Sequence, residues 1–380
     1  MNLDYSQEFP YKDRIYLNNA SISRMPRSSI TAMSDFLVNY NELGPDSEAS
    51  DNYLREKLSN LRKEISGLIN CRPEEVIFTQ SVTDGINTVA NGLKLNPNSN
   101  VILRGSTHEH PANHYPWVRM GQRVELRNLS IDETGYFDID TFRNTIDERT
   151  GLVVLSHALF NTGAIIPVEE IGKILSEKSI PFFVDAAQTV GCIPDVDVNK
   201  INCNFMSFNG SKWLCGPMGM GIFFCRRDSS DLIEPLQVGG ESAIFHENKI
   251  IHKEIPARFQ AGFRNWSGVA GLEASTSYLK KVGIFAIRKR NIMLANLLRE
   301  EISKINGAIL YGPTEEKDRT SIVSFTIQNQ DSKTLVAKLE KENMILAVRD
   351  IFSKKVVRIS PHFFNTESEI HSVVDVIKKN

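Results

Sequence analysis

The segment Ser207–Pro217 has the sequence SFNGSKWLCGP, which places Lys212 just after a short apolar stretch and a run of small residues. Twenty-seven positions earlier, Asp185 follows another apolar stretch, Phe182–Val184. A lysine amine can condense with an aldehyde, and a buried carboxylate can keep a pyridine nitrogen protonated. Pyridoxal phosphate needs both groups. The pair therefore predicts this cofactor, and chemistry at the α-carbon of an amino acid.

Around this pair, short apolar strands alternate with helical stretches as far as residue 225. A helix is expected over residues 82–93, because its apolar side chains recur three and four positions apart. Continuous apolar strands between helices are typical of a mostly parallel sheet that is covered on both faces. The expected strands are 76–78, 101–103, 124–126, 152–155, 182–184 and 220–225.

The pattern changes after about residue 262. Two long helical stretches, 268–282 and 285–305, precede strands at 321–325 and 356–359. Thr366 and Glu369 have the spacing of a capping box for a final helix. The whole pattern predicts an α/β chain whose large domain has a mostly parallel sheet, with a smaller α+β C-terminal domain. The expected bounds are 14–262 for the large domain and 263–380, together with 1–13, for the small one.

Composition narrows the class of protein. The chain has 380 residues, 41% of them hydrophobic, and a net charge of −2, which gives no electrostatic case for nucleic acid or an anionic membrane. No apolar run is long enough to span a bilayer, and the polar N-terminus has no signal-peptide core. The five cysteines are scattered without a Cys-x-x-Cys pair, which argues against a metal site or disulfides and fits the cytoplasm.

The cofactor phosphate needs N–H donors at a helix N-terminus. Residues 80–85 lie between the strand 76–78 and the helix that follows it, and they include two hydroxyl side chains. Ser and Thr caps also open many helices that bind nothing. The candidate phosphate ligands are Ser81, Val82, Thr83, Asn209 and Ser211.

The ring and the substrate need further partners. His110 follows a strand and can stack on the ring, although such histidines are more often plain surface or core residues. Gln188 can reach the phenolic oxygen of the ring. Arg358 lies on an apolar strand and can bind a carboxylate bidentately, unless it only protects a sheet edge. Asn19 and Ala20 can donate to the same carboxylate.

In this order the motifs resemble the class V aminotransferase family of fold-type I pyridoxal-phosphate enzymes, which includes cysteine desulfurases, selenocysteine lyases, kynureninases and isopenicillin-epimerase-like proteins. The motifs are Tyr16–Ala20, Phe78–Asn87, Glu109–Trp117, Ser156–Ala158, Val184–Gln188, Ser207–Lys212, Arg258–Gly262 and Arg358–Thr366. The resemblance covers nearly the whole chain. It implies the family's cofactor, its two domains, and a homodimer with active sites near the subunit interface.

The chain also departs from the family pattern. Cysteine desulfurases carry a nucleophilic cysteine on a loop before the carboxylate-binding arginine, but Arg349–Val357 is short and has no cysteine. Since a persulfide needs a mobile thiolate, that mechanism is in doubt. Phe263-Arg264 replaces a Thr-Pro whose threonine reaches the neighbouring subunit's phosphate, so Arg264 is a candidate cofactor ligand. Phe160 stands where desulfurases have an asparagine, and Ser211 where a histidine is common.

The candidate catalytic residues are Lys212, His110 and Asp185, acting on a small α-amino acid. Removal of the α-proton by Lys212 can lead to β-elimination, epimerisation or transamination. The first hypothesis is a desulfurase-like carbon–sulfur or carbon–selenium β-lyase, motivated by the loop 109–117. The alternative is an aminotransferase or epimerase, motivated by the missing cysteine loop and by Phe263 and Trp266. A non-catalytic protein is disfavoured, because the lysine, the aspartate and the arginine are all present.

Overall fold

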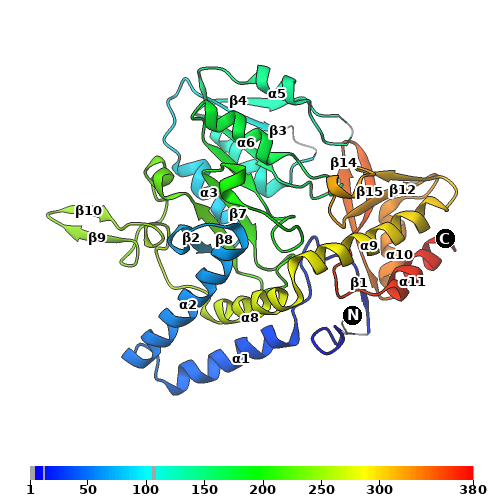
Figure 1. Ribbon diagram of the computed structural model, residues 1–380, viewed down its shortest axis with the longest axis horizontal. Coiled ribbons are helices and arrows are strands. Elements are labelled where there is room, and N and C mark those ends of the chain that lie inside the picture. The colour runs from blue at the N-terminus through cyan, green and yellow to red at the C-terminus, as the bar shows by residue number, and fades with distance from the viewer. Residues whose placement is uncertain (1–4, 12, 105–107, 133, 380) are drawn as a thin grey trace.

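The computed structural model describes residues 5–11, 13–104, 108–132 and 134–379. A seven-stranded sheet with the order β2-β8-β7-β6-β5-β3-β4 forms its centre (Figure 1). Only β8 runs antiparallel to its neighbours among these strands, so the predicted mostly parallel sheet is confirmed. The strands are β2 (Val76–Thr79), β3 (Asn100–Arg104), β4 (Glu125–Leu129), β5 (Thr150–Ser156), β6 (Phe182–Asp185), β7 (Phe205–Asn209) and β8 (Gly221–Cys225).

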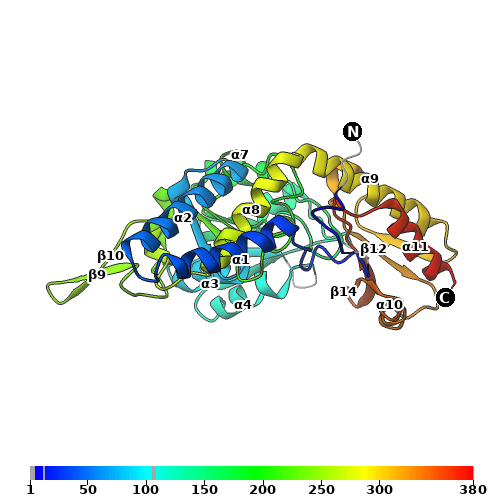
Figure 2. The same cartoon turned by 90° about the horizontal axis from the view of Figure 1, so that it is seen from below.

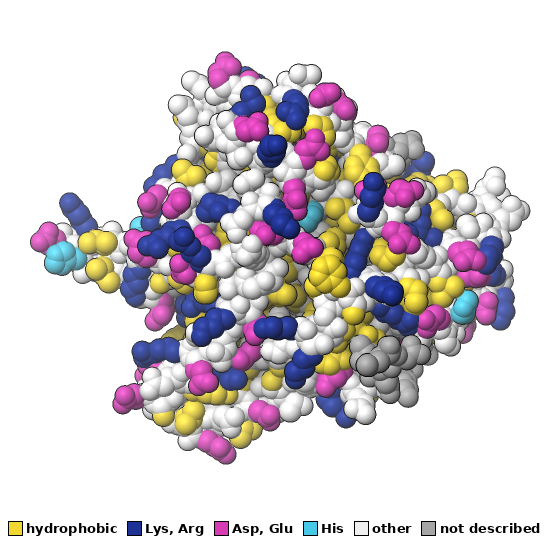
Figure 3. Space-filling view, viewed as in Figure 1, with side chains coloured by type: hydrophobic (Ala, Val, Ile, Leu, Met, Phe, Trp, Pro, Cys, Tyr) yellow, Lys and Arg dark blue, Asp and Glu magenta, His cyan; other side chains and the backbone are white. Residues whose placement is uncertain are grey.

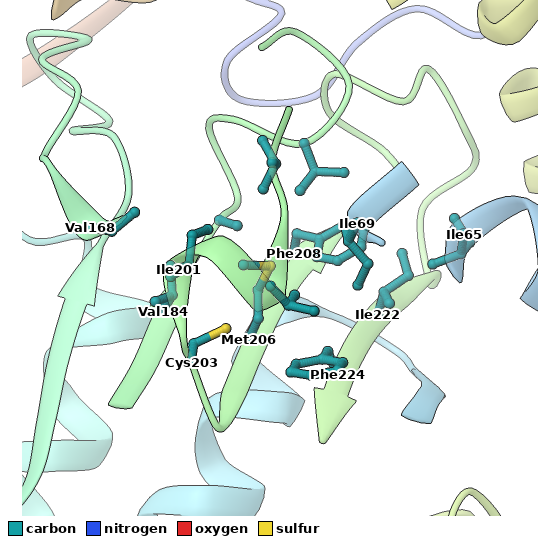
Figure 4. Close-up of a cluster of buried hydrophobic side chains, with 14 of the residues drawn as sticks. Ile65, Ile69, Val168, Val184, Ile201, Cys203, Met206, Phe208, Ile222 and Phe224 are labelled. Atoms are coloured by element: carbon teal, nitrogen blue, oxygen red, sulfur yellow. The ribbon is translucent and has the colours of Figure 1, made fainter. Parts of the chain in front are cut away.

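Helices cover both faces of this sheet, as the continuous apolar strands predict. Val184 and Phe208 pack on one face together with side chains of α2 (Glu48–Ile69), in the cluster shown in Figure 4. Phe183 points to the opposite face, where α3 (Val82–Gly92) packs. Successive strand residues alternate between faces, so two separate cores form. The other helices of this part are α4 (Tyr115–Met120), α5 (Ile139–Thr145), α6 (Val168–Glu177) and α7 (Val198–Ile201).

The C-terminal part has its own antiparallel sheet in the order β11-β12-β15-β14. Its core includes Leu298, Phe325 and Val373. The predicted capping box forms, with Thr366 and Glu369 bonded reciprocally at the start of the last helix. The elements are β11 (Ala308–Tyr311), β12 (Val323–Ile327), β14 (Ala347–Ile351), β15 (Lys354–Ile359), α9 (Ile284–Ser303), α10 (Ser332–Lys341) and α11 (Glu367–Lys378). The predicted fold class, a large α/β part with a smaller α+β part, is confirmed.

Segments near the predicted domain boundaries pack across them. Strand β1 (Ile15–Tyr16) pairs in parallel with β13 (Met344–Ile345), and Leu17 joins the C-terminal core. Helix α8 (Trp266–Val282) lies beside α1 (Arg27–Glu42) and α2, next to the large sheet (Figure 2). The boundaries at residues 14 and 262 therefore stay a prediction.

Helices α1 and α2 were not predicted from the sequence, nor was the hairpin of β9 (Ala243–His246) and β10 (Lys249–His252). The hairpin projects from the body in Figures 1 and 2. In α1 the apolar residues Leu37 and Val38 are exposed, so no single apolar stripe marks the helix in the sequence.

The surface carries both signs of charge. In the face shown in Figure 3, basic and acidic side chains are interspersed. Within the described ranges, no helix combines the length and the apolar character that crossing a bilayer requires.

Alanine substitutions at two helical glycines should change the stability of the protein in opposite directions. A Cβ on Gly172 of α6 would lie 1.7 Å from the carbonyl oxygen of Ile201, so Gly172→Ala should destabilise the protein by about 1–3 kcal/mol. A Cβ on Gly67 of α2 meets nothing within 4 Å, so Gly67→Ala should stabilise it by about 0.5–1 kcal/mol. Urea unfolding measures both, and a tolerated Gly172→Ala would contradict the close approach of α6 and α7.

Candidate active site

One edge of the large sheet gathers the residues expected to carry chemistry. Asp185 ends β6 and Asn209 ends β7, and these strands pair in parallel, so both residues reach the same edge. A cavity of about 270 Å³ opens there. Ten of the thirteen predicted site residues line it: Ala20, Ser81, Val82, Thr83, His110, Asp185, Gln188, Asn209, Lys212 and Arg358.

Lys212 lies in the turn that follows β7 and faces this cavity. Burial lowers the pKa of its amine to about 8; Asp185 opposes this shift, and Arg358 and Arg349 contribute to it. An amine with this pKa is partly neutral near neutral pH, and only the neutral form can attack an aldehyde or accept a proton.

Asp185 is a buried carboxylate without an ion-pair partner among the described residues. Its Oδ1 accepts a hydrogen bond from the Ala187 N–H at 2.9 Å, and no ion pair to it forms among the described residues. Burial raises the pKa of Asp185 to about 6, although Lys212 opposes the shift. A cation at the floor of the cavity would complete this environment, so Asp185 fits a protonated pyridine nitrogen.

The orientation of Gln188 is fixed by a neighbouring side chain. The indole Nε1–H of Trp213, which can only donate, bonds to Gln188 Oε1 at 2.9 Å. The amide nitrogen of Gln188 therefore points the other way, where it donates one hydrogen to the Ala20 carbonyl at 2.9 Å. Its second hydrogen remains for an acceptor in the cavity, which agrees with the predicted bond to the ring oxygen.

The N-terminus of α3 faces the cavity, with Ser81 as its cap. The Val82 N–H, one of the expected phosphate donors, is already bonded to Asn209 Oδ1 at 2.8 Å. Asn209 thus ties β7 to the start of α3 in addition to lining the cavity. Thr83 and the positive end of the helix are the parts best placed to receive an anion.

The loop that carries His110 is held by a buried ion pair beneath it. Glu109 accepts bonds from Arg104 Nη2 at 2.7 Å, from Ser156 Oγ at 2.6 Å and from Asn113 Nδ2 at 3.0 Å. Arg104 and Glu109 are almost completely buried. Because Arg104 ends β3 and Ser156 ends β5, the network joins the loop to the edge of the sheet.

His110 stands at the open side of the cavity, edge-on to Phe160 with ring centroids 5.1 Å apart. Loss of solvent, together with the nearby cations Lys212 and Arg349, lowers the pKa of His110 to about 4. A neutral imidazole can lie against a flat ring without adding charge, as the predicted stacking role requires.

Two arginines on the cavity wall have no acidic partner. Arg358 donates to the Phe160 carbonyl at 2.7 Å, and neither Arg358 nor Arg349 forms an ion pair with a described residue. Burial, together with Arg349, holds the pKa of Arg358 well below its usual range. Two arginines without an acidic partner can bind an anion, so this wall is suited to a substrate carboxylate.

Three predicted residues lie outside this cavity. Asn19 is buried and donates to the Ser360 carbonyl at 2.9 Å, so its side chain joins the N-terminal segment to the C-terminal part. Ser211 does not line the cavity. Arg264 lies on a separate cavity of about 740 Å³, beside the fully exposed Phe263.

Three residues that were not predicted to belong to the site also line the cavity: Ser21, Phe160 and Arg349. A signal for Arg349 was present, because it lies on the strand before Arg358. However, only the pairing of β14 with β15 brings Arg349 close to Arg358, and this pairing was not predicted from the sequence.

The segment without a cysteine loop is a tight hairpin. β14 and β15 pair up to Ile351 and Lys354, so only Phe352 and Ser353 form the turn. All five cysteines are free, and none lines the cavity. Burial raises the pKa of Cys71, Cys192, Cys203 and Cys215 to about 12 and that of Cys225 as well.

A parallel sheet with a lysine, an aspartate and a cationic wall at its carboxyl edge defines a pyridoxal-phosphate enzyme of fold type I. The family model Aminotransferase class-V matches residues 15–373. The chain belongs to the class V aminotransferase family and depends on pyridoxal phosphate.

Known relatives agree with this assignment. A probable cysteine desulfurase of Methanothermobacter thermautotrophicus is 32% identical, over 99% of this chain and 97% of its own length. The apo cysteine desulfurase of Thermococcus onnurineus NA1 has a TM-score of 0.89 and 26% identity, covering 97% and 94% of the two chains. The cystine C-S lyase C-DES, solved with its reaction product cysteine persulfide, has a TM-score of 0.90 at 23% identity, covering 98% and 99%; it shows the same fold.

Borohydride reduction of the cofactor-loaded protein should fix the label on Lys212. Lys212→Arg should abolish the label, while Lys200→Arg, an exposed control on α7, should not. In apoprotein, the rate of cofactor attachment should rise with pH and level off above about 8, because only the neutral amine attacks. Peptide mapping by mass spectrometry that finds the label on another lysine would overturn the assignment.

Proposed function

We propose that this protein is a carbon–sulfur (or carbon–selenium) β-lyase that acts on a small α-amino acid of the cysteine class. One observation carries the proposal: the cavity combines Lys212, Asp185 and the two arginines, but offers no thiol. The names of the relatives, which are cysteine desulfurases, support a sulfur-containing substrate.

When bound, pyridoxal phosphate supplies an electron sink for the electron pair left at the substrate α-carbon. Arg358 and Arg349 hold the substrate carboxylate and so fix the α-carbon relative to Lys212. Lys212, neutral in part because of its lowered pKa, accepts the α-proton on Nζ. The Asp185 carboxylate would hold a positive charge on the ring nitrogen of the bound cofactor, and His110 would lie against the ring.

The fate of the sulfur follows from the absence of a thiol. The carbon–sulfur bond breaks, and the sulfur takes up a proton as it leaves, as hydrogen sulfide from cysteine or as cysteine persulfide from cystine. Water then hydrolyses the remaining three-carbon unit to pyruvate and ammonia. A protein persulfide would need a mobile thiolate near the substrate. The turn Phe352–Ser353 is too short to carry one inward, and the pKa values of the buried cysteines disfavour the thiolate.

We further propose that the protein is a homodimer and that it works in the cytoplasm. Arg264 lines a different cavity from Lys212, so it can reach a cofactor phosphate only across a subunit interface. Phe263, fully exposed beside it, is suited to burial against a second subunit. Five free cysteines support a reducing compartment.

A transaminase or epimerase is the second candidate, because the same proton transfer begins all three reactions. Phe263 and Trp266 motivated it as lining for a bulkier substrate. Neither lines the cavity of Lys212 within the chain, so they give it no direct support.

A panel of amino acids tests the reaction. With L-cysteine or L-cystine the holoenzyme should release pyruvate and sulfur product in equal amounts, without a protein persulfide when the substrate sulfur is radiolabelled. Cys71→Ser should leave the rate unchanged. Keto acid without sulfur release would indicate transamination, inversion would indicate epimerisation, and a labelled protein cysteine would revive the desulfurase mechanism.

Arg358→Ala should raise the KM for the best substrate of this panel by about 10- to 100-fold, because one charged hydrogen-bonding group contributes about 1.5–3 kcal/mol. Arg119→Ala, at an exposed position of α4, is the matched control and should leave KM unchanged. Steady-state kinetics measure both. An unchanged KM for Arg358→Ala would place the carboxylate elsewhere.

A further inference from the structure

Two guanidinium groups on the cavity wall share one hydroxyl. Arg349 Nη2 and Arg358 Nη2 each donate to Ser21 Oγ at 2.6 Å. The hydroxyl hydrogen of Ser21 bonds in turn to Asn18 Oδ1 at 2.8 Å, and the same Oδ1 accepts from Arg358 at 3.0 Å. The Ser21 hydroxyl therefore accepts two hydrogen bonds and donates one. These three bonds fix the orientation of the hydroxyl group.

Two guanidinium groups this close together would be unfavourable without an acceptor between them, because both are positively charged. Each guanidinium is partly or wholly buried. Among the described residues, each is otherwise bonded only to neutral oxygens, of Phe160 and Asn18 for Arg358 and of Val348 for Arg349. Both groups donate to the same oxygen, so two like charges lie close together, and Arg349 helps to lower the pKa of Arg358. Arg358 also keeps a buried Nε–H without a partner among the described residues. The pair thus has unused donors for an oxyanion.

The backbone that carries Ser21 is itself held in place. Asn18 forms a bridge with Ser360, next to the pairing of β1 with β13. Tyr16 donates its hydroxyl hydrogen to the Ile22 carbonyl at 2.6 Å, which closes the segment around Ser21. The hydroxyl is therefore a fixed point, whereas Arg349 lies on the short hairpin β14–β15 and is only partly buried.

We infer that Ser21 is a positioning residue that holds Arg349 and Arg358 together as one binding unit for the substrate carboxylate. Without its oxygen, the two cations lose their shared acceptor, and Arg349, the less buried one, moves away. The inference rests on the proposed function in one respect, namely that the ligand is an α-amino acid.

Two probes that differ only in the carboxylate test this inference on the holoenzyme. L-Alanine carries the carboxylate and L-alaninol carries a neutral hydroxymethyl group in its place. Their dissociation constants come from the absorbance change of the bound cofactor. Ser21→Ala should weaken L-alanine about tenfold or more and leave L-alaninol unchanged, since a bond to a charged group contributes about 1.5–3 kcal/mol. Ser21→Thr keeps the hydroxyl and should retain the affinity.

Other outcomes overturn the inference. An unchanged affinity of Ser21→Ala for L-alanine, or an equal loss for both probes, would mean that Ser21 does not act through the arginines. If Ser21→Ala does not fold, Ser21→Cys gives the same comparison, because sulfur is a weak acceptor. With a turned-over substrate, Ser21→Ala should raise KM and leave kcat nearly intact. L-Alanine binding that depends on Ser21 in a protein that releases no pyruvate would contradict only the proposed function.

Discussion

The parallel pairing of β6 with β7 is the constraint on which the site depends. In this register Asp185 lies opposite Ser207, so both strands end at the same edge of the sheet, where Asp185, Asn209 and Lys212 line one cavity. The strands are buried on both faces, and burial shifts the two titratable groups in opposite directions: it raises the pKa of Asp185 and lowers that of Lys212. Both shifts disfavour charge, and a charged cofactor is what relieves them.

The cavity is enclosed by parts of the chain that are far apart in the sequence. The segment around Ser21, the loop before Asn161 and the hairpin β14–β15 meet at the cavity wall that carries Arg358. Asn161 is one link in this wall. It follows Phe160, which stands where desulfurases have an asparagine, and it does not line the cavity. Its amide donates to the Asp350 carbonyl of β14 at 2.8 Å. The small sheet therefore delivers both arginines to the large one.

The absence of a cysteine loop changes what the same scaffold can do. A desulfurase mechanism transfers sulfur to a thiolate of the protein, whereas this hairpin ends in a two-residue turn whose Phe352 packs edge-on against His108 at 4.9 Å. The turn thus packs against the segment that leads to His110. Under the proposed lyase mechanism, the sulfur product leaves in solution, and the protein needs no acceptor surface for it.

The sequence by itself determined the class of fold, the cofactor and the main residues, because apolar periodicity and the spacing of Asp185 and Lys212 are local signals. It also indicated the missing thiol, because the segment Arg349–Val357 contains no cysteine. The tertiary structure decided which candidate residues lie in one cavity. Asn19 instead donates to the Ser360 carbonyl, and Arg264 lines another cavity, whereas Ser21 and Arg349 join the wall of the cavity of Lys212. These contacts join residues more than 300 positions apart, such as Ser21 and Arg349, and no local pattern records a pairing that only the packing of two sheets creates.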